Sequence, residues 1–152
     1  MKKKLINFIL LLIILSNCSY QPIYSTKNMM VTINNIEAEN SSLNNKIVRA
    51  LKQITSNHIT ENKIDIKIET FKEVVVKSKD KKGNPKIFEL ILNLELEIIN
   101  ETNNASKKQF TKRISFNNDD DKFKLSEYQN ELENSFVKEL VTEIINYLSS
   151  YK

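Results

Sequence analysis

The chain is poor in the residues that mark tight turns and common catalytic sites. Its 152 residues include one glycine, two prolines, one histidine and one cysteine. The scarcity of glycine and proline argues against a turn-rich β-sandwich, because the short connections of such folds use these residues heavily. We therefore expect a single α+β domain, since a chain of this length can bury a real core.

Recognisable catalytic and metal-binding motifs are also missing. The sequence contains no glycine-rich phosphate loop and no HExxH. His58 has no nucleophile motif near it, so we interpret it as a solvated loop residue rather than part of a Ser/His/acid triad. The run from Asp119 to Asp121 lacks the spaced ligands and the glycine of an EF-hand, which favours a solvated acidic turn over a calcium site. We expect a protein that is not an enzyme and holds no metal.

The first eighteen residues have the pattern of a bacterial export signal. Three lysines, Lys2 to Lys4, precede an apolar run from Leu5 to Leu15 that only Asn7 interrupts. The run is eleven residues long, whereas a helix needs about 20 apolar residues to span the hydrocarbon core of a membrane. A permanent transmembrane helix is therefore not expected, and residues 1–17 are predicted to be a signal peptide.

The signal ends in a sequence that favours lipidation. Residues 15–18, Leu-Ser-Asn-Cys, resemble the lipobox that the lipoprotein signal peptidase cuts, although Asn17 departs from the usual Gly, Ala or Ser. From this resemblance we expect Cys18 to carry covalent diacylglycerol and an N-acyl chain. Such an anchor would be stable, because several acyl chains hold a protein in a membrane far better than one. A lipidated Cys18 leaves no thiol for a disulfide, a metal or a nucleophile. The alternative is an ordinary secretory signal in which Cys18 is incidental.

The residues after Cys18 indicate location and domain boundaries. In the enterobacterial sorting pattern an Asp after the cysteine retains the protein in the inner membrane, so Ser19 favours the periplasmic face of the outer membrane. The stretch to Asn28 has no periodicity and contains Pro22, which indicates a tether. We predict a lipidated N-terminus and tether at 18–28 and one folded domain at 29–152.

The apparent basicity of the chain comes largely from its signal. The formal net charge is +4, but removing residues 1–17 deletes three lysines and no acid, leaving 20 Lys plus Arg against 19 Asp plus Glu. A nucleic-acid-binding domain normally carries a basic face. We therefore expect no nucleic-acid partner.

The first half of the domain is predicted to form a strand, a helix and a further strand. A β-prone segment from near Met29 stops at residues 37–40, and a helix follows to about Asn57, capped by Asn40, Ser41 or Ser42. From Lys63 the pattern alternates with period two and extends through residues 74–76, with a bulge expected near Phe71. The helix has apolar residues at helical spacing: Leu43, Ile47, Ala50, Leu51 and Ile54.

Two more strands and a long helix complete the predicted order β-α-β-β-β-α. Residues 79–85 contain Gly83 and Pro85 and predict a hairpin loop, and a third antiparallel neighbour follows after residues 100–106. Ser126 and Gln129 have capping-box spacing and predict the start of the last helix. We expect two helices on one face of a four-stranded, largely antiparallel, mixed sheet. The clearest strand has these apolar residues on one face: Phe88, Leu90, Leu92, Leu94, Leu96 and Ile98.

Two basic stretches are candidate anion sites. The first surrounds the predicted hairpin loop, where charged groups at a mobile tip can meet phosphates or acidic partner loops. The second lies in the predicted fourth strand. A merely solvated surface remains the alternative for both. The stretches are Lys77, Lys79, Lys81, Lys82 and Lys86, which flank Asp80, and Lys107, Lys108, Lys112 and Arg113.

The tether and the order of elements together resemble the LPS-assembly lipoprotein LptE family. The local motif is Cys18-Ser19-Tyr20-Gln21-Pro22-Ile23-Tyr24, in which Ser19 replaces the expected Gly. The resemblance implies a noncatalytic subunit that plugs an LptD-like outer-membrane β-barrel, assists its assembly and aids lipopolysaccharide delivery to the cell surface. The first basic stretch would then contact lipopolysaccharide phosphates. The alternatives are a periplasmic lipid-carrying or transport-auxiliary lipoprotein, an envelope scaffold for another assembly machine and, more distantly, a hydrolase.

Overall fold

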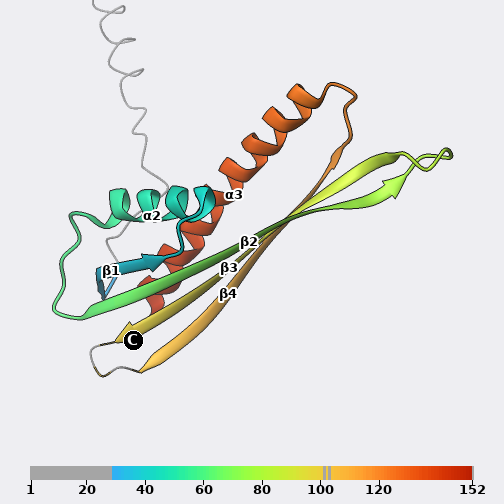
Figure 1. The fold of residues 1–152 in the computed structure, drawn as a ribbon. Helices are drawn as coiled ribbons and strands as arrows, with labels where there is room; N and C mark the ends of the chain where they lie inside the picture. The colour runs from blue at the N-terminus through green and yellow to red at the C-terminus, as the bar shows by residue number, and fades with distance from the viewer. Residues whose placement is uncertain (1–28, 101, 103, 152) are drawn as a thin grey trace, which may run out of the picture.

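A computed structural model describes residues 29–100, 102 and 104–151 of the chain. The predicted signal peptide, the tether and Cys18 lie outside the described residues. The elements are β1 (Thr32–Ala38), α2 (Ser42–Thr55), β2 (Lys63–Lys79), β3 (Pro85–Asn100), β4 (Ala105–Asn117) and α3 (Lys122–Ser150). This order confirms the predicted α+β arrangement of two helices and a four-stranded sheet (Figure 1).

The sheet is mixed, with the strand order β1-β2-β3-β4. β1 lies parallel to the first part of β2, with its register running from the Thr32–Lys63 pair to the Ala38–Ile68 pair, whereas the other two strand pairs are antiparallel. α2 connects β1 to β2, as a parallel pair requires a crossover. The β2–β3 hairpin continues well past the ends of β1 and α2 (Figure 1).

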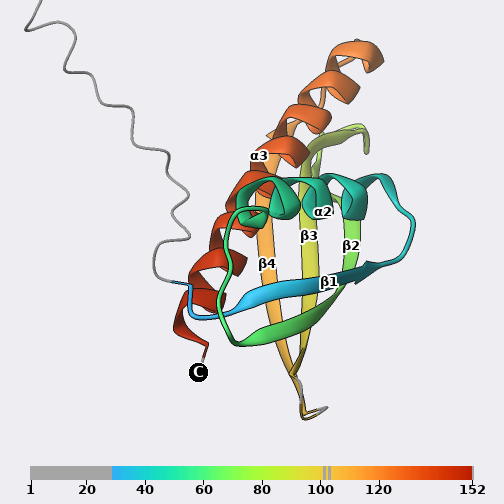
Figure 2. The ribbon, with the colours of Figure 1, turned by 90° about the vertical axis from the view of Figure 1, so that its left-hand side faces the viewer.

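The core lies between one face of the sheet and the two helices. Alternation along β3 turns every second side chain toward the helices, and five of these, from Leu90 to Ile98, are at most 1% exposed. α2 contributes Ile47 and Leu51, and α3 covers the same face (Figure 2). Burial of each such side chain stabilises the fold by roughly 1.5–3 kcal/mol. The residues of α3 that share this core are Leu125, Phe136, Val137, Leu140, Val141, Ile144, Ile145 and Leu148.

Two local predictions are wrong. The bulge lies not at Phe71, which pairs regularly with Asn93, but at Lys77, where the register shifts as β2 approaches the hairpin. The last helix starts one turn earlier than its capping-box spacing suggested, because the Asp121 carboxylate accepts hydrogen bonds from the N–H groups of Phe123 and Lys124. The N-cap of α2 is Ser41, one of the three residues predicted for it. Among the described residues, no helix is long and apolar enough to cross a membrane.

Candidate functional site

The tip of the β2–β3 hairpin is a compact turn built around Asp80. Its Oδ1 accepts hydrogen bonds from the backbone N–H groups of Lys82 and Asn84, both at 2.8 Å, and the turn closes where the Asp80 N–H donates to the Asn84 carbonyl. Gly83 adopts φ +88°, a left-handed conformation that glycine accepts without strain. Hydrogen bonds from the backbone and the side chain of Asn84 lower the pKa of Asp80. The tip therefore holds its lysines on an ordered turn.

Four of the five lysines predicted as a basic cluster are free at this tip. Lys79, Lys81, Lys82 and Lys86 are exposed, and none of their ammonium groups has a partner among the described residues. Lys77 differs, because its Nζ lies 2.8 Å from Glu89 Oε1 and 2.9 Å from Ser115 Oγ. The hydrogen bond from Lys77 lowers the pKa of Glu89. The structure therefore separates Lys77 from the other four.

A shallow groove joins the tip to the turn between β4 and α3. Lys81, Lys82 and Lys122 line it together with Asp80 and Asp120. Exposed charges of opposite sign in one groove partly cancel each other, and salt weakens the remaining attraction for anions. The groove is therefore less basic than the lysine count of the sequence suggests, and Lys79 and Lys86 are not among the residues that line it.

The second basic stretch does not form a patch. Lys107 pairs with Glu95 at 2.6 Å on the face of the sheet away from the helices, whereas Lys112 reaches Glu143 at 2.6 Å and Glu139 at 3.1 Å on α3. Lys108 Nζ lies 5.7 Å from the ring centroid of Tyr147. The hydrogen bonds that Lys112 donates to Glu143 and Glu139 outweigh burial and raise the pKa of Lys112. These residues join elements of the fold instead of gathering to bind an anion.

No described element covers the second face of the sheet, which we call the open sheet face. It consists of the odd-numbered positions of β2 as far as Lys77, of β3 and of β4. Polar pairs cross it, including Lys67 with Glu69 at 2.8 Å and Thr111 with Asn93 at 2.7 Å. Phe71 stands out on this face with 75% exposure. The open sheet face is therefore a mostly polar surface available for contact.

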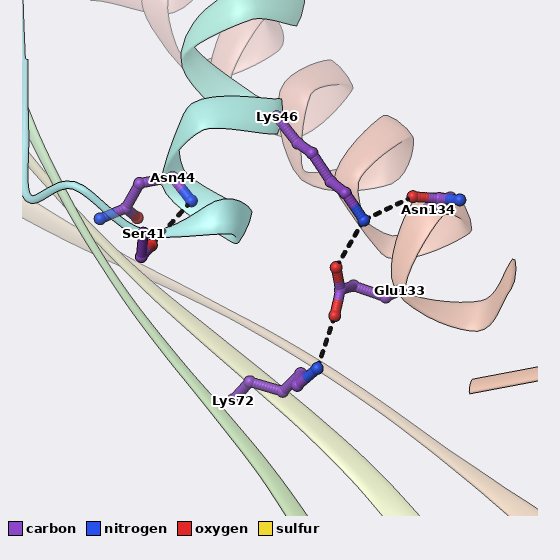
Figure 3. Close-up of polar contacts among 6 residues, drawn as sticks. All are labelled: Ser41, Asn44, Lys46, Lys72, Glu133 and Asn134. Carbon is purple, nitrogen blue, oxygen red and sulfur yellow. Dashed lines mark hydrogen bonds and ion pairs between the residues drawn. The ribbon is translucent and has the colours of Figure 1, made fainter. Parts of the chain in front are cut away.

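A buried carboxylate, which sequence reasoning missed, fixes the helices to the sheet. Glu133 of α3 is 5% exposed and accepts from Lys46 of α2 and Lys72 of β2, both at 2.7 Å (Figure 3). Burial acts to raise the pKa of Glu133, but hydrogen bonds from Lys46 and Lys72 and their charges lower it overall. Lys46 also donates to Asn134 at 2.9 Å. The only sequence signal was a glutamate on the apolar stripe of the helix.

His58 and the acidic turn are two other features that the sequence singled out. His58 is half-buried rather than solvated as predicted, and its Nε2 is shielded without a hydrogen-bond partner in the part of the chain that the structure describes. Asp119 accepts from the Asp121 N–H, and Asp121 caps α3. Within the described residues, no group of three or more His, Cys, Asp or Glu side chains is placed to hold a metal.

Comparison with known proteins identifies the fold. No known family model matches the chain, and no curated protein matches it. A minor lipoprotein from Acinetobacter baumannii has a similar structure, with a TM-score of 0.63 and 13% identity over 80% of this chain and 92% of that one. A candidate lipoprotein from Caulobacter crescentus gives 0.56 at 10% identity, over 76% and 88% of the two chains.

A third similar structure is the uncharacterized lipoprotein B from Nitrosomonas europaea, with a TM-score of 0.52 and 14% identity over 85% of this chain and 94% of that one. The alignments cover most of both chains in all three cases, so the likeness extends over the whole described domain and is not confined to one motif. The described domain therefore has a fold found in bacterial lipoproteins.

Proposed function

We propose that this chain is an outer-membrane lipoprotein of the LptE type, anchored through Cys18 at the periplasmic face. In this role it plugs an LptD-like β-barrel, assists barrel assembly and helps to deliver lipopolysaccharide to the cell surface, without catalysis. The observation that carries the proposal is a lipoprotein-type fold with an uncovered polar sheet face, in a chain whose residues 15–18 resemble a lipobox.

The filled core favours a plug over a lipid carrier. A carrier needs an apolar cavity for acyl chains, whereas Leu92, Leu94 and Leu140 fill the space between sheet and helices with no exposed surface. The interior of a water-filled barrel is polar, and the open sheet face offers hydrogen-bonding and charged side chains to match it. The four free lysines of the tip suit lipopolysaccharide phosphates through charge-assisted hydrogen bonds.

The partner is tested by purification of the native complex. The chain with a C-terminal tag is extracted from membranes in mild detergent, and the proteins recovered with it are identified by mass spectrometry. A large outer-membrane barrel in equal proportion is expected. A monomer with bound lipid, or an inner-membrane transporter in place of the barrel, would overturn the plug and favour the carrier or transport-auxiliary role.

The contacting surface is tested with a photocrosslinking amino acid. Placed at Gln109 on the open sheet face, it is expected to capture the barrel in whole cells. The matched control is Ser135, an exposed residue of α3. Equal capture from both positions, or capture from Ser135 alone, would contradict the assignment of the open sheet face to the barrel.

The role of the tip is tested by removing its charge. Replacing Lys79, Lys81, Lys82 and Lys86 by glutamine is expected to lower binding of the detergent-solubilised protein to lipopolysaccharide, and the loss should shrink at high salt because screening already weakens the same contacts. The control replaces Lys107, Lys108 and Lys112, which already contact protein groups. If both sets of changes reduce binding equally, the effect reflects total charge and the tip has no special role.

A further inference from the structure

Most of β2 has a neighbour on one side only. β1 pairs with β2 from Lys63 to Ile68, and beyond Ile68 the described residues supply β3 as the single neighbouring strand. We call the stretch Phe71–Lys77 the free β2 edge; it lies on the part of the hairpin that extends past β1 and α2 (Figure 1). The unpaired N–H and C=O groups of such an edge are a template for another strand.

The free β2 edge exposes more apolar surface than the opposite edge of the sheet. β4, the other outermost strand, carries Lys107, Lys108, Lys112 and Arg113, and lysines on an edge discourage pairing. The free β2 edge has two lysines, Lys72 and Lys77, which pair with Glu133 and Glu89. It also exposes large apolar side chains: Phe71 by 75%, Val74 by 40% and Val76 by 43%. Its central run of three valines has a high preference for β-structure. This edge is therefore suited to pairing.

We propose that the free β2 edge pairs with the same edge of a second copy of this chain, antiparallel and centred on Val75. A two-fold axis through Val75 places Glu73 opposite Lys77 twice and Val74 opposite Val76 twice. Opposite residues of an antiparallel pair share a face, so both Glu73–Lys77 pairs lie on the open sheet face. The edge is thus complementary to itself in charge, and it sets apolar valines against each other.

The charges disfavour the two registers whose axis lies two residues away on either side. Moving the axis to Glu73 sets two glutamates against each other, and moving it to Lys77 does the same with two lysines. Glu73 is exposed and has no partner among the described side chains, so it gains a cation in the pair. Lys77 keeps 53% of its side chain exposed beside Glu89, which leaves its ammonium accessible to a second carboxylate.

The bulge at Lys77 limits the pairing to a short ladder. Beyond Val76 the register of β2 against β3 shifts twice before the hairpin turn, and such irregularity bends the strand away from a neighbour. A short ladder implies reversible association. The proposed pairing applies to copies of the chain that are not bound to a barrel. It does not depend on the proposed function.

Disulfide trapping tests the pairing directly. With Val75→Cys, the proposed two-fold axis brings the two introduced thiols opposite each other, so mild oxidation of the full chain purified in detergent is expected to give a crosslinked dimer. The unmodified chain, whose one cysteine is Cys18, sets the background. Gln109→Cys, on the edge strand β4, controls for copies that merely share a micelle. Crosslinking of Val75→Cys no faster than Gln109→Cys would overturn the proposal.

A charge swap in the Val75→Cys background tests the register. Glu73→Lys, which sets two pairs of lysines against each other, and Lys77→Glu, which does the same with glutamates, are each expected to weaken association by about tenfold. Combining the two changes restores opposite charges and should restore crosslinking. Glu131→Lys on α3 changes the net charge by the same amount as Glu73→Lys but lies away from the edge, so it should not affect crosslinking. If the combined variant stays as weak as the single ones, the proposed register is wrong.

Discussion

Replacing Glu133 by glutamine removes the charge that joins both helices to the sheet. The side chain keeps its size, but the ammonium groups of Lys46 and Lys72 lose the carboxylate that each contacts at 2.7 Å. Removing one partner of a buried ion pair costs about 3–5 kcal/mol, whereas an exposed pair contributes about 0–1 kcal/mol. Since the two lysine side chains are 35% and 46% exposed and can turn to water, we expect an intermediate loss of about 2 kcal/mol.

The loss is measured by urea unfolding of the lipid-free chain from residue 18 carrying Cys18→Ser, followed by far-UV circular dichroism because the protein has no tryptophan. The matched control is Glu139→Gln, since Glu139 contacts Lys112 at 3.1 Å and is 50% exposed. Its removal should cost less than about 1 kcal/mol. If Glu133→Gln is no more destabilising than Glu139→Gln, burial of the carboxylate does not control its contribution and the reasoning fails.

The pH dependence of the same pair of proteins gives an independent check. The pKa of Glu133 is lower in the folded state because the lysine contacts outweigh burial. Its contribution is therefore fully present above the unfolded pKa, about 4.3 for a glutamate, and is lost as pH falls through the lower folded value. We expect the stability difference between the wild type and Glu133→Gln to be constant near neutral pH and to shrink below about pH 4.

Three further changes test separate parts of the molecule. Cys18→Ser should abolish incorporation of labelled palmitate and release the chain from the outer-membrane fraction. Asp121→Ala should cost about 1 kcal/mol of unfolding free energy as a lost N-cap, while Ser126→Ala, inside α3, should cost much less. Gly83→Ala should cost about 1–2 kcal/mol of unfolding free energy, because residue 83 has a φ of +88°, which alanine adopts only with strain. A Cβ there would meet nothing within 4 Å, so no steric clash adds to this cost. An unchanged urea midpoint would show that the turn adapts.

The sequence predicts a helix or strand well where one face of it is buried and the other is exposed to water. The alternation along Leu90, Leu92 and Leu94 predicted both the strand and its buried face, because a shift by one residue would expose all three. Short local motifs were less reliable. The spacing of Ser126 and Gln129 suggested a cap, but Asp121 lies earlier, and its carboxylate binds the first free N–H groups of α3.

The charged site was harder to predict because neighbours in a strand do not share a face. Lys107 and Lys108 are adjacent in the sequence, yet one meets Glu95 on the open sheet face and the other meets Tyr147 on the helix side. Their partners come from other elements of the fold, which composition does not reveal. The ion pairs of Glu133 could not be predicted for the same reason, because its two lysine partners lie 87 and 61 residues away in the sequence.

β1 is short, so the sheet has a region in which β2 has a neighbour on both sides and a free β2 edge that β1 does not reach. Its seven residues pair with only the first part of the seventeen-residue β2, and the ion pairs of Glu133 secure the helices on the sheet near the end of that region. The free β2 edge includes Lys72, one of the two partners of Glu133, and its remaining residues as far as Lys77 also lie beyond the residues that β1 pairs with. Changes at Val75 and at Glu133 share no contacts, so their effects on unfolding free energy should add within about 0.5 kcal/mol. Strong coupling between these two positions would mean that they interact in the folded state, for example through Lys72, which lies on β2 and contacts Glu133.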